Sequence, residues 1–438
     1  MNKILKSCTT NGTPLLGLTG ATLAFFAGLA TISLLADSVR LFGDVMIMSP
    51  IMIAMLVAVP NLTGTLLRIP FSAIADSSGG RNVILISLIL STIGMFCLYF
   101  IVLVYYPLGM SDSIIYPLLL FFGALMGIGG AVFSPGIAQT SYWFPQEKQG
   151  MALGVFGGVG NLSPGVAAFL FPVILMFTNL ADTFLIFSFC ILACTIGYFI
   201  LGKNAWYFQL MHQGKSKEES IKIARECGQR IFPKGNARKS LAISGKNWKT
   251  WVIVFIYFNT FGGFLALAVW LPTYWIMFHS LDLTTAVWFT ALYSIVTSVF
   301  RIIGGKVSDN LGGEKTTVIA LIIMLCGSIM MVVFYGIAMD IAALMILGTG
   351  MGLGNASTFK LVPQEIPDAI GGASGWIGGI GGLGGFVLPT VMAMFIVKGD
   401  VLKTGYATGF SVFIVLTLLS FIGIFMLSKH SLRKNRVL

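Results

Sequence analysis

Two arginines occupy matching positions in long apolar stretches of the sequence. Arg68 precedes Asp76 by eight residues, Arg301 precedes Asp309 by eight, and each aspartate is followed three residues later by a Gly-Gly pair. If each aspartate marks a helix end, a rise of 1.5 Å per residue puts each arginine about 12 Å inside a membrane. Charged side chains at such depth are costly and nearly always face an interior cavity. The pair therefore predicts a polar cavity within the membrane.

The arginines could instead reach back to the interface, as long basic side chains do, or pair with buried acids. A reach of about 12 Å is too long for the side chain. The middle of the apolar stretches holds no Asp or Glu, because the acids fall at ends and loops, as Asp37, Asp76, Asp309 and Glu365 do. Since an unpaired buried charge is costly, we expect the counter-charge to be the substrate. The planar fork of arginine suits bidentate binding of an oxyanion, so a small planar anion would fit two opposed forks.

The composition requires a membrane around these arginines. The residues are 56% hydrophobic and 10% charged, against about 25% charged in a soluble domain. Apolar runs long enough to cross a bilayer, about 20 residues, number twelve. They start near Leu15, Met46, Ile84, Ser113, Met151, Thr183, Trp251, Ala286, Thr317, Ile341, Gly371 and Tyr406. The first run is too long for a signal peptide, and we interpret it as an uncleaved helix.

The basic residues predict the orientation of these spans. The segment from Lys203 to Lys249 contains eleven Lys and Arg against three Glu, and the tail from Lys429 to Arg436 is also basic. With twelve spans this segment lies on the same side as both termini, whereas the opposite loops carry only Arg40, Lys398 and Lys403. The positive-inside rule then makes the termini cytoplasmic, which indicates a multi-pass protein of the bacterial inner membrane. The basic segment, with a short surface helix around Lys217 to Arg225, is more easily explained as a topological anchor than as a lipid-recognition site.

A second repeat joins the fifth span to the eleventh. Each contains a glycine-rich run after a Pro-Gln-Glu, which starts at Pro145 and at Pro363. The signature glycines of the two runs are Gly157, Gly158, Gly160, Gly378, Gly379, Gly381 and Gly382. Small faces let membrane helices approach closely, and we also expect them to slide past the arginine-bearing spans during transport.

Two related six-span halves joined by a basic loop are the arrangement of major facilitator transporters, with a substrate site near the midplane between the halves. We therefore predict an all-α polytopic fold of two pseudo-symmetric six-helix bundles. The expected parts are an N-terminal bundle over residues 1–202, a basic cytoplasmic linker over 203–249, and a C-terminal bundle with a short tail over 250–438.

Other functions lack the residues that they need. The net charge of +11 is confined to certain loops, which argues against a nucleic-acid partner. Cys190 and Cys194 lie one helical turn apart without His or carboxylate neighbours, so no metal and no cofactor are expected. The spans contain no nucleophile, metal cluster or carboxylate pair, so we expect no enzyme. The three histidines, at 212, 279 and 430, fall outside the expected spans.

Beyond these patterns, the whole chain resembles the nitrate/nitrite porters of the major facilitator superfamily. The resemblance is strongest in Leu-Leu-Arg68-Ile-Pro-Phe, in Phe-Pro-Gln-Glu-Lys-Gln-Gly through Asn161, in Arg301 through Gly313, and in the glycine run from Gly378. The two glycine-rich stretches look like the signature motifs of that family. One departure is Gly382, which stands where the first half has Asn161.

The resemblance implies a role for each matching residue. Arg68 and Arg301 match the pair that clamps the anion, Phe133 and Phe261 match aromatic residues on either face of the planar ion, and Tyr257 and Asn161 match hydrogen-bonding neighbours. It implies a secondary transporter of nitrate, nitrite or both, working by alternating access as a monomer in the lipid bilayer. Because two arginines repel each other in an empty site, we expect exchange of one anion for another. A porter of another small anion, organic or carboxylate, and a nitrate/proton symporter remain as alternatives.

Overall fold

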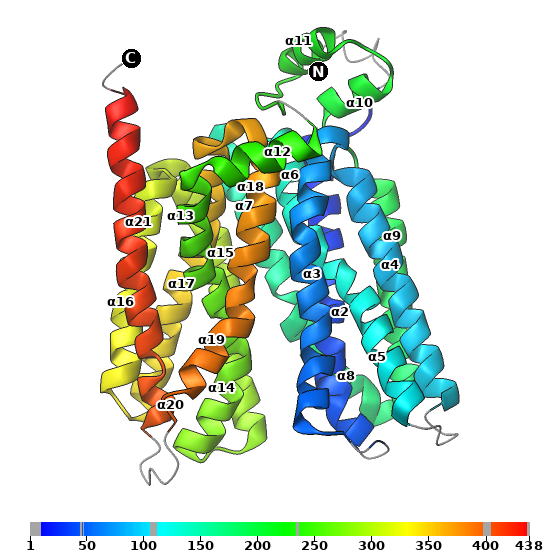
Figure 1. Cartoon of the computed structure of the whole chain (residues 1–438), viewed down its shortest axis with the longest axis vertical. Coiled ribbons are helices and arrows are strands. Elements are labelled where there is room, and N and C mark those ends of the chain that lie inside the picture. The colour runs from blue at the N-terminus through cyan, green and yellow to red at the C-terminus, as the bar shows by residue number, and fades with distance from the viewer. Residues whose placement is uncertain are drawn as a thin grey trace. The chain divides into compact units, whose positions relative to one another are not determined.

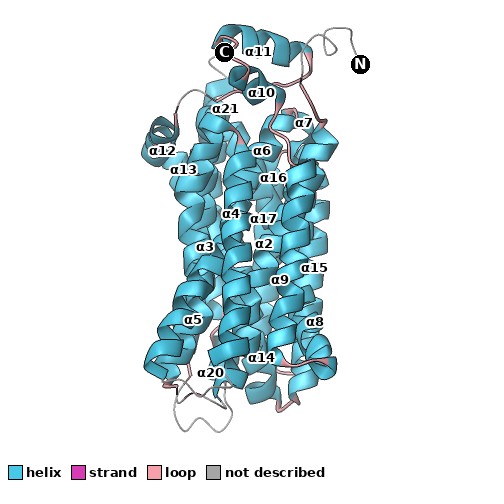
Figure 2. Cartoon of the chain, turned by 90° about the vertical axis from the view of Figure 1, so that its right-hand side faces the viewer, coloured by secondary structure: helices cyan, strands magenta, loops and turns pink. Residues whose placement is uncertain are grey.

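The structure, a computed structural model, describes residues 10–43, 46, 48–105, 112–233, 236–396 and 404–435. Within these ranges the chain forms helices joined by loops and contains no β-strand (Figure 2). The all-α prediction is therefore confirmed for the described part of the chain. Lys398, Lys403 and Arg436, which entered the prediction of orientation, lie outside these ranges.

Twelve segments of the described residues are helical, apolar and long enough to cross a membrane, as the hydropathy pattern predicts. They are Pro14–Ala36, Ile51–Ser78, Gly80–Val104, Ser113–Trp143, Gln146–Phe177, Leu180–Leu201, Trp248–His279, Thr284–Leu311, Gly313–Val333, Ile337–Glu365, Pro367–Ala393 and Gly405–His430. Large apolar side chains lie exposed on them, such as Phe386 at 66% and Phe425 at 67%. Lipid can cover such a surface, whereas the backbone polar groups bond within the helices. The chain is thus a multi-pass membrane protein.

Two histidines differ from the expectation. His279 and His430 are the last residues of the seventh and twelfth spans rather than loop residues. The side chain of His279 is only 7% exposed. A hydropathy average misses a single histidine at a span end, because apolar neighbours such as Phe278 dominate the window.

Several spans change pitch along their length. In the fourth span a 3-10 turn, η2 (Ile128–Val132), joins α5 (Asp112–Gly127) to α6 (Phe133–Trp143). In the seventh span a π-helical turn, η3 (Phe258–Gly262), joins α13 (Trp248–Tyr257) to α14 (Gly263–His279). Such turns redirect side chains and recur at functional sites. The fifth and eleventh spans are also divided, into α7 (Gln146–Asn161) and α8 (Ser163–Phe177), and into η4 (Pro367–Ala369), α18 (Ile370–Ile380), η5 (Gly381–Leu383) and α19 (Gly384–Ala393).

The helices pack as two compact units. The first contains the residues up to Pro145 and Val159–Ser240, and the second contains Gln146–Gly158 and the residues from Leu241 onward. The first part of α7 therefore packs with the second unit, while the division at residues 202 and 250 stays a prediction. The other long helices are α2 (Pro14–Gly43), α3 (Pro50–Ser78), α4 (Gly80–Phe100) and α9 (Leu180–Leu201) in the first unit, and α15 (Leu283–Leu311), α16 (Gly313–Val333), α17 (Ile337–Glu365) and α21 (Ser411–Asn435) in the second (Figure 1).

The repeated Gly-Gly pairs end the two arginine-bearing helices. Gly79 follows α3 with φ 78°, and Gly312 follows α15 with φ 88°. Only glycine adopts this left-handed region without strain, and the backbone N–H of each bonds to the helix carbonyl four residues back. The second glycine of each pair starts α4 or α16. The sequence repeat is therefore a repeated helix stop, which fixes how far each arginine lies from the helix end.

The basic linker forms short helices, α10 (Trp206–His212), α11 (Lys217–Glu226) and α12 (Ala237–Lys246). The expected surface helix around Lys217 is confirmed as α11, and Ser216 caps its first turn by accepting from the N–H of Glu219. The hydroxyl of Ser240 in α12 donates to Asp76 at the end of α3. The linker is thus attached to the helix that carries Arg68.

Candidate functional site

Arg68 is oriented by the irregular part of the fourth span. Its side chain is 2% exposed, and its Nε donates to the carbonyl of Gly130 over 3.1 Å. Its guanidinium carbon lies 5.1 Å from the centroid of the Phe133 ring, within the range of a cation–π contact. Gly130 belongs to η2, and Phe133 is the first residue of α6. The change of pitch thus presents a carbonyl and an aromatic ring to the same guanidinium.

Phe133 is supported from behind by α2. The ring of Phe25 lies 4.9 Å from that of Phe133, and both side chains are fully buried. A Cβ atom on Gly160 would overlap the Phe25 ring, so a glycine at this position leaves the space that the Phe25 ring occupies. Asn161, the next residue, ends α7 and is 2% exposed. In the first unit the structure therefore connects Arg68, Phe133 and Gly160 through one aromatic pair.

Arg301 has an equivalent environment in the second unit. Its side chain is 1% exposed, and its guanidinium carbon lies 5.5 Å from the centroid of Phe261. Phe261 belongs to η3 and stacks on Tyr257, with ring centroids 4.8 Å apart and planes at 12°. Each predicted arginine thus lies against the aromatic residue expected for its half.

The aromatic residues continue from Tyr257 and Phe261 as a wall. Phe359 of α17 meets Tyr257 edge to face at 4.8 Å, and Phe264 of α14 lies 6.1 Å from Phe261. A Cβ on Gly381 would come within 2.9 Å of Tyr257, so this glycine leaves space for the tyrosine ring. Gly378, Gly379 and Gly382 are buried in α18 and η5.

The glycines of α7 allow a close approach to α15. A Cβ on Gly157 would come within 2.6 Å of the guanidinium carbon of Arg301, and one on Gly158 would come within 2.8 Å of the carbonyl of Ser298. One on Gly154 would lie 3.0 Å from the carbonyl of Arg301. Close packing is therefore the role that these glycines have in the structure, whereas their sliding during transport stays a prediction.

The two repeated aspartates form hydrogen bonds and an ion pair near the ends of α3 and α15. Asp76 accepts hydrogen bonds from Ser240 and, over 2.5 Å, from the Tyr142 hydroxyl. Asp309 accepts from the backbone N–H groups of Gly150 and Met151, and its Oδ1 lies 2.5 Å from Nζ of Lys360. Each carboxylate lies eight residues from its arginine, which is about 12 Å along the helix. These contacts of the two carboxylates are thus made at the helix ends, about two helical turns away from the arginines.

Sequence reasoning missed two buried polar residues of α17. Lys360 is 3% exposed and would have been found by the same search for charge in apolar stretches that identified the arginines. Asn355 is fully buried, and within the described residues neither its amide nitrogen nor its amide oxygen has a hydrogen-bond partner. It lies one helical turn from Phe359 and from Met351, which accepts from Tyr293. Its signal was weak, because asparagine in a glycine-rich run also suits a helix contact.

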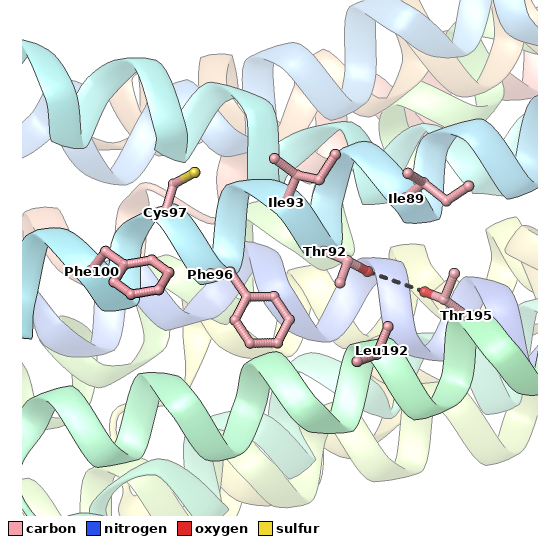
Figure 3. A pocket seen from close by; sticks show the side chains of 8 residues that line it. All are labelled: Ile89, Thr92, Ile93, Phe96, Cys97, Phe100, Leu192 and Thr195. Carbon is pink, nitrogen blue, oxygen red and sulfur yellow. Dashed lines mark hydrogen bonds between the residues drawn. The ribbon is translucent and has the colours of Figure 1, made fainter.

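A separate groove lies between α4 and α9 and has a volume of about 370 Å³. Among its lining residues, the hydroxyls of Thr92 and Thr195 share a hydrogen bond of 3.1 Å (Figure 3). The residues that line it are Ile89, Thr92, Ile93, Phe96, Cys97, Phe100, Leu192 and Thr195. None of them carries a charge, so this groove does not suit an anion.

Comparison of the sequence with protein families matches the Major Facilitator Superfamily over residues 15–389. Among related sequences, a probable nitrate/nitrite antiporter of Thermus thermophilus, NarK1, is 28% identical, with 79% of this chain and 77% of that protein aligned. A probable nitrate transporter of Staphylococcus epidermidis, NarT, is 26% identical, with 86% of this chain and 87% of that protein aligned.

Solved structures show the same architecture at low sequence identity. The proton:xylose symporter XylE superposes with a TM-score of 0.73 at 14% identity, over 95% of each chain. A human organic anion transporter superposes with a TM-score of 0.68 at 13% identity, over 94% of this chain and 100% of that chain. At such identities the similarity concerns the fold alone.

Proposed function

Because the chain belongs to the Major Facilitator Superfamily, and is thus a transporter rather than an enzyme, we propose that it carries nitrate, nitrite or both by alternating access. The observation that carries this proposal is the matched environment of the two arginines. Each arginine is at most 2% exposed, and its guanidinium group lies against a phenylalanine ring, Arg68 on Phe133 and Arg301 on Phe261. Relatives named for nitrate and nitrite, at 26% and 28% identity, support the choice of ion.

The chemistry of these residues suits a small planar oxyanion. A guanidinium group offers parallel N–H donors in one plane, which match two oxygens of such an ion. The rings of Phe133 and Phe261 are flat, and flat groups pack against such rings in defined geometries. Tyr257 and Asn161 supply neutral hydrogen-bonding groups. In this proposal one anion is bound by both arginines, and a tetrahedral ion such as sulfate matches the planar arrangement less well.

Exchange of anions follows from the charge of the site. Two guanidinium groups that share a site repel each other in a medium of low dielectric constant, so closure without an anion is unfavourable. The loaded carrier reorients and the empty carrier does not, which makes exchange of nitrate for nitrite the natural cycle. The name of the Thermus thermophilus relative, a probable nitrate/nitrite antiporter, is consistent with this cycle.

The proposed location is the bacterial inner membrane, with both termini and the linker helices α10, α11 and α12 in the cytoplasm. The eleven Lys and Arg between Lys203 and Lys249 support this orientation through the positive-inside rule. We propose that the protein works as a monomer, because each unit supplies one arginine and its aromatic partner from the same chain.

Thermal unfolding of the purified protein with different anions tests the choice of substrate. A ligand at 100 times its dissociation constant stabilises the folded state by about 2.7 kcal/mol. Nitrate and nitrite should raise the unfolding midpoint, while chloride and sulfate at equal ionic strength should change it much less. Equal shifts for all four anions would contradict the proposal, and a larger shift with a carboxylate would favour the alternative of an organic-anion porter.

Proteoliposomes test the exchange cycle. Uptake of labelled nitrate should increase when nitrite or nitrate is present inside the vesicles. Uptake that ignores internal anion but follows an imposed pH gradient would show proton symport instead.

A further inference from the structure

A cluster of titratable side chains lies where α14 ends and α17 begins, outside the candidate anion site. Nε2 of His279 lies 2.7 Å from Oδ2 of Asp340, and the Tyr274 hydroxyl donates to the same oxygen over 2.5 Å. The Asp340 side chain is fully buried, and the His279 side chain is 7% exposed. Three groups that can hold a proton thus meet at one carboxylate oxygen away from water.

The surrounding helices favour a charged pair at this point. His279 is the last residue of α14, where the helix dipole favours a cation, and Asp340 lies in the first turn of α17, where it favours an anion. The rings of Tyr274, Trp275 and Phe278 lie between 4.9 and 5.5 Å from the imidazole. Aromatic rings thus surround the imidazole.

A second observation concerns the other carboxylate oxygen. Oδ1 of Asp340 is buried and has no hydrogen-bond partner within the described residues, and the same is true of the Trp275 indole nitrogen. Buried polar atoms of folded proteins are nearly always bonded. The contacts to His279 and Tyr274 therefore both involve the same carboxylate oxygen, Oδ2.

Other titratable groups lie on the neighbouring elements. Asp282 caps α15 and is exposed, and hydrogen bonds from the Thr285 hydroxyl and N–H lower its pKa. Tyr335, between α16 and α17, lies 5.8 Å from Phe278, and Tyr406 of α20 (Gly405–Thr408) lies 6.0 Å from Trp270. Among the described residues, His279 is the only basic group paired with Asp340.

We propose that His279, Asp340 and Tyr274 form a proton-binding site through which transport responds to pH. With one shared proton the pair has no net charge. Binding and release of that proton change the charge of the buried pair by one unit, and a buried charge without a partner is costly. Proton occupancy is therefore linked to the packing of α14 against α17. This inference goes beyond the proposed function, since neither the anion clamp nor the exchange cycle uses these residues.

Neutral variants of similar size test the site. His279→Gln and Asp340→Asn keep a hydrogen-bonding group but cannot exchange a proton at the pair. Labelled-anion exchange is measured in proteoliposomes with equal pH inside and outside, over about pH 5 to 8, where imidazole titrates. The wild-type rate should change with pH by up to about tenfold per unit, the limit for one linked proton, and each variant should lose this dependence. His212→Gln, exposed on α10, is the matched control and should keep it.

If both neutral variants keep the wild-type pH profile, the pair is only a structural clamp and the proposal is wrong. Tyr274→Phe, which keeps the ring and removes the third proton-bearing group, provides an additional variant. It should displace the profile along the pH axis without abolishing it, and an unchanged profile would count against a role for the hydroxyl.

A measurement without substrate separates this proposal from the proposed function. The thermal unfolding midpoint of the anion-free protein is compared between the wild type and the His279→Gln, Asp340→Asn double variant over the same pH range. The difference between the two midpoints should vary with pH, and a constant difference would overturn the proton site. Because no nitrate is needed, this result is interpretable even if nitrate is not the substrate.

Discussion

Substitution of either buried arginine is expected to have the most specific effect on nitrate transport. Arg68 and Arg301 each combine burial with a phenylalanine contact, and lysine can reproduce their charge but not the planar fork. Arg68→Lys or Arg301→Lys should lower nitrate exchange by about tenfold to a hundredfold, the effect of losing one or two hydrogen bonds to a charged group. Labelled nitrate uptake in proteoliposomes measures this loss.

Arg225 offers a matched control for these variants. It lies over Phe232 at 5.6 Å, in a similar cation–π contact in the linker. Arg225→Lys should leave uptake unchanged. If Arg68→Lys and Arg301→Lys transport nitrate as well as Arg225→Lys does, the arginines are not the clamp.

Asn355 tests whether an unsatisfied buried amide belongs to the site. If its amide bonds to the anion, Asn355→Leu should reduce transport about tenfold or more. The same change should leave the unfolding midpoint unchanged or raise it, because it removes a buried polar group without a partner. Uptake and thermal unfolding of the same preparation measure the two effects.

The control for Asn355 is Asn259, another fully buried asparagine. Its amide nitrogen donates to the hydroxyls of Thr417 and Ser420 over 3.1 and 3.3 Å. Asn259→Leu should therefore lower the unfolding midpoint. A fall in midpoint with normal transport in Asn355→Leu would show that Asn355 has a structural role.

At the scale of elements, the approach of α7 to α15 positions Arg301. A methyl group at Gly157 would meet the guanidinium group, which is buried and cannot swing into solvent. Gly157→Ala should therefore fold, since the group that must shift is the end of a side chain, but should lose most of its transport. Gly165→Ala on α8, where nothing lies within 4 Å, should retain both, and uptake normalised to folded protein distinguishes these outcomes.

The ion pair between Lys360 and Asp309 joins α17 to α15, and Asp309 also bonds to two N–H groups of α7. Its side chains are 3% and 10% exposed. Removing one partner of a buried pair costs about 3 to 5 kcal/mol, so Lys360→Met should lower the unfolding midpoint clearly.

The exposed pair of Lys215 with Glu219 provides the comparison. Its side chains are 30% and 50% exposed, and such pairs contribute about 1 kcal/mol or less. Lys215→Met should have almost no effect on the unfolding midpoint. Equal effects of the two substitutions would mean that the Lys360 pair does not hold these helices together.

At the scale of the whole molecule, the boundary between the two units falls within one helix, α7. Gln146–Gly158 precedes the linker in sequence but packs in the second unit. Residues 250–438 produced alone would lack this segment and would expose Gly305 and Asp309, which it covers. We expect this fragment to be unstable alone and to be rescued by co-expression with residues 1–249. Size-exclusion chromatography measures the outcome, and a monodisperse fragment with the wild-type unfolding midpoint would contradict the expectation.

The sequence by itself determined the properties that depend on local pattern. Apolar runs of about 20 residues indicate spans wherever they occur, and the repeated Arg–Asp–Gly-Gly spacing identified two equivalent helices and their ends. Arg68 and Arg301 stood out because a charge inside an apolar run is rare, whatever the helix packs against. Lys360 met the same criterion, although it was not singled out from the sequence.

Only the tertiary structure decided which side chains meet. His279 and Asp340 are 61 residues apart in sequence, and Lys360 and Asp309 are 51 apart. The glycines of α7 up to Gly158 pack on α15, which lies more than a hundred residues later in the sequence but in the same compact unit. Such contacts depend on the rotation and register of neighbouring helices, which follow from packing over the whole helix surface. A single sequence records the composition of each helix face but not the partner of that face.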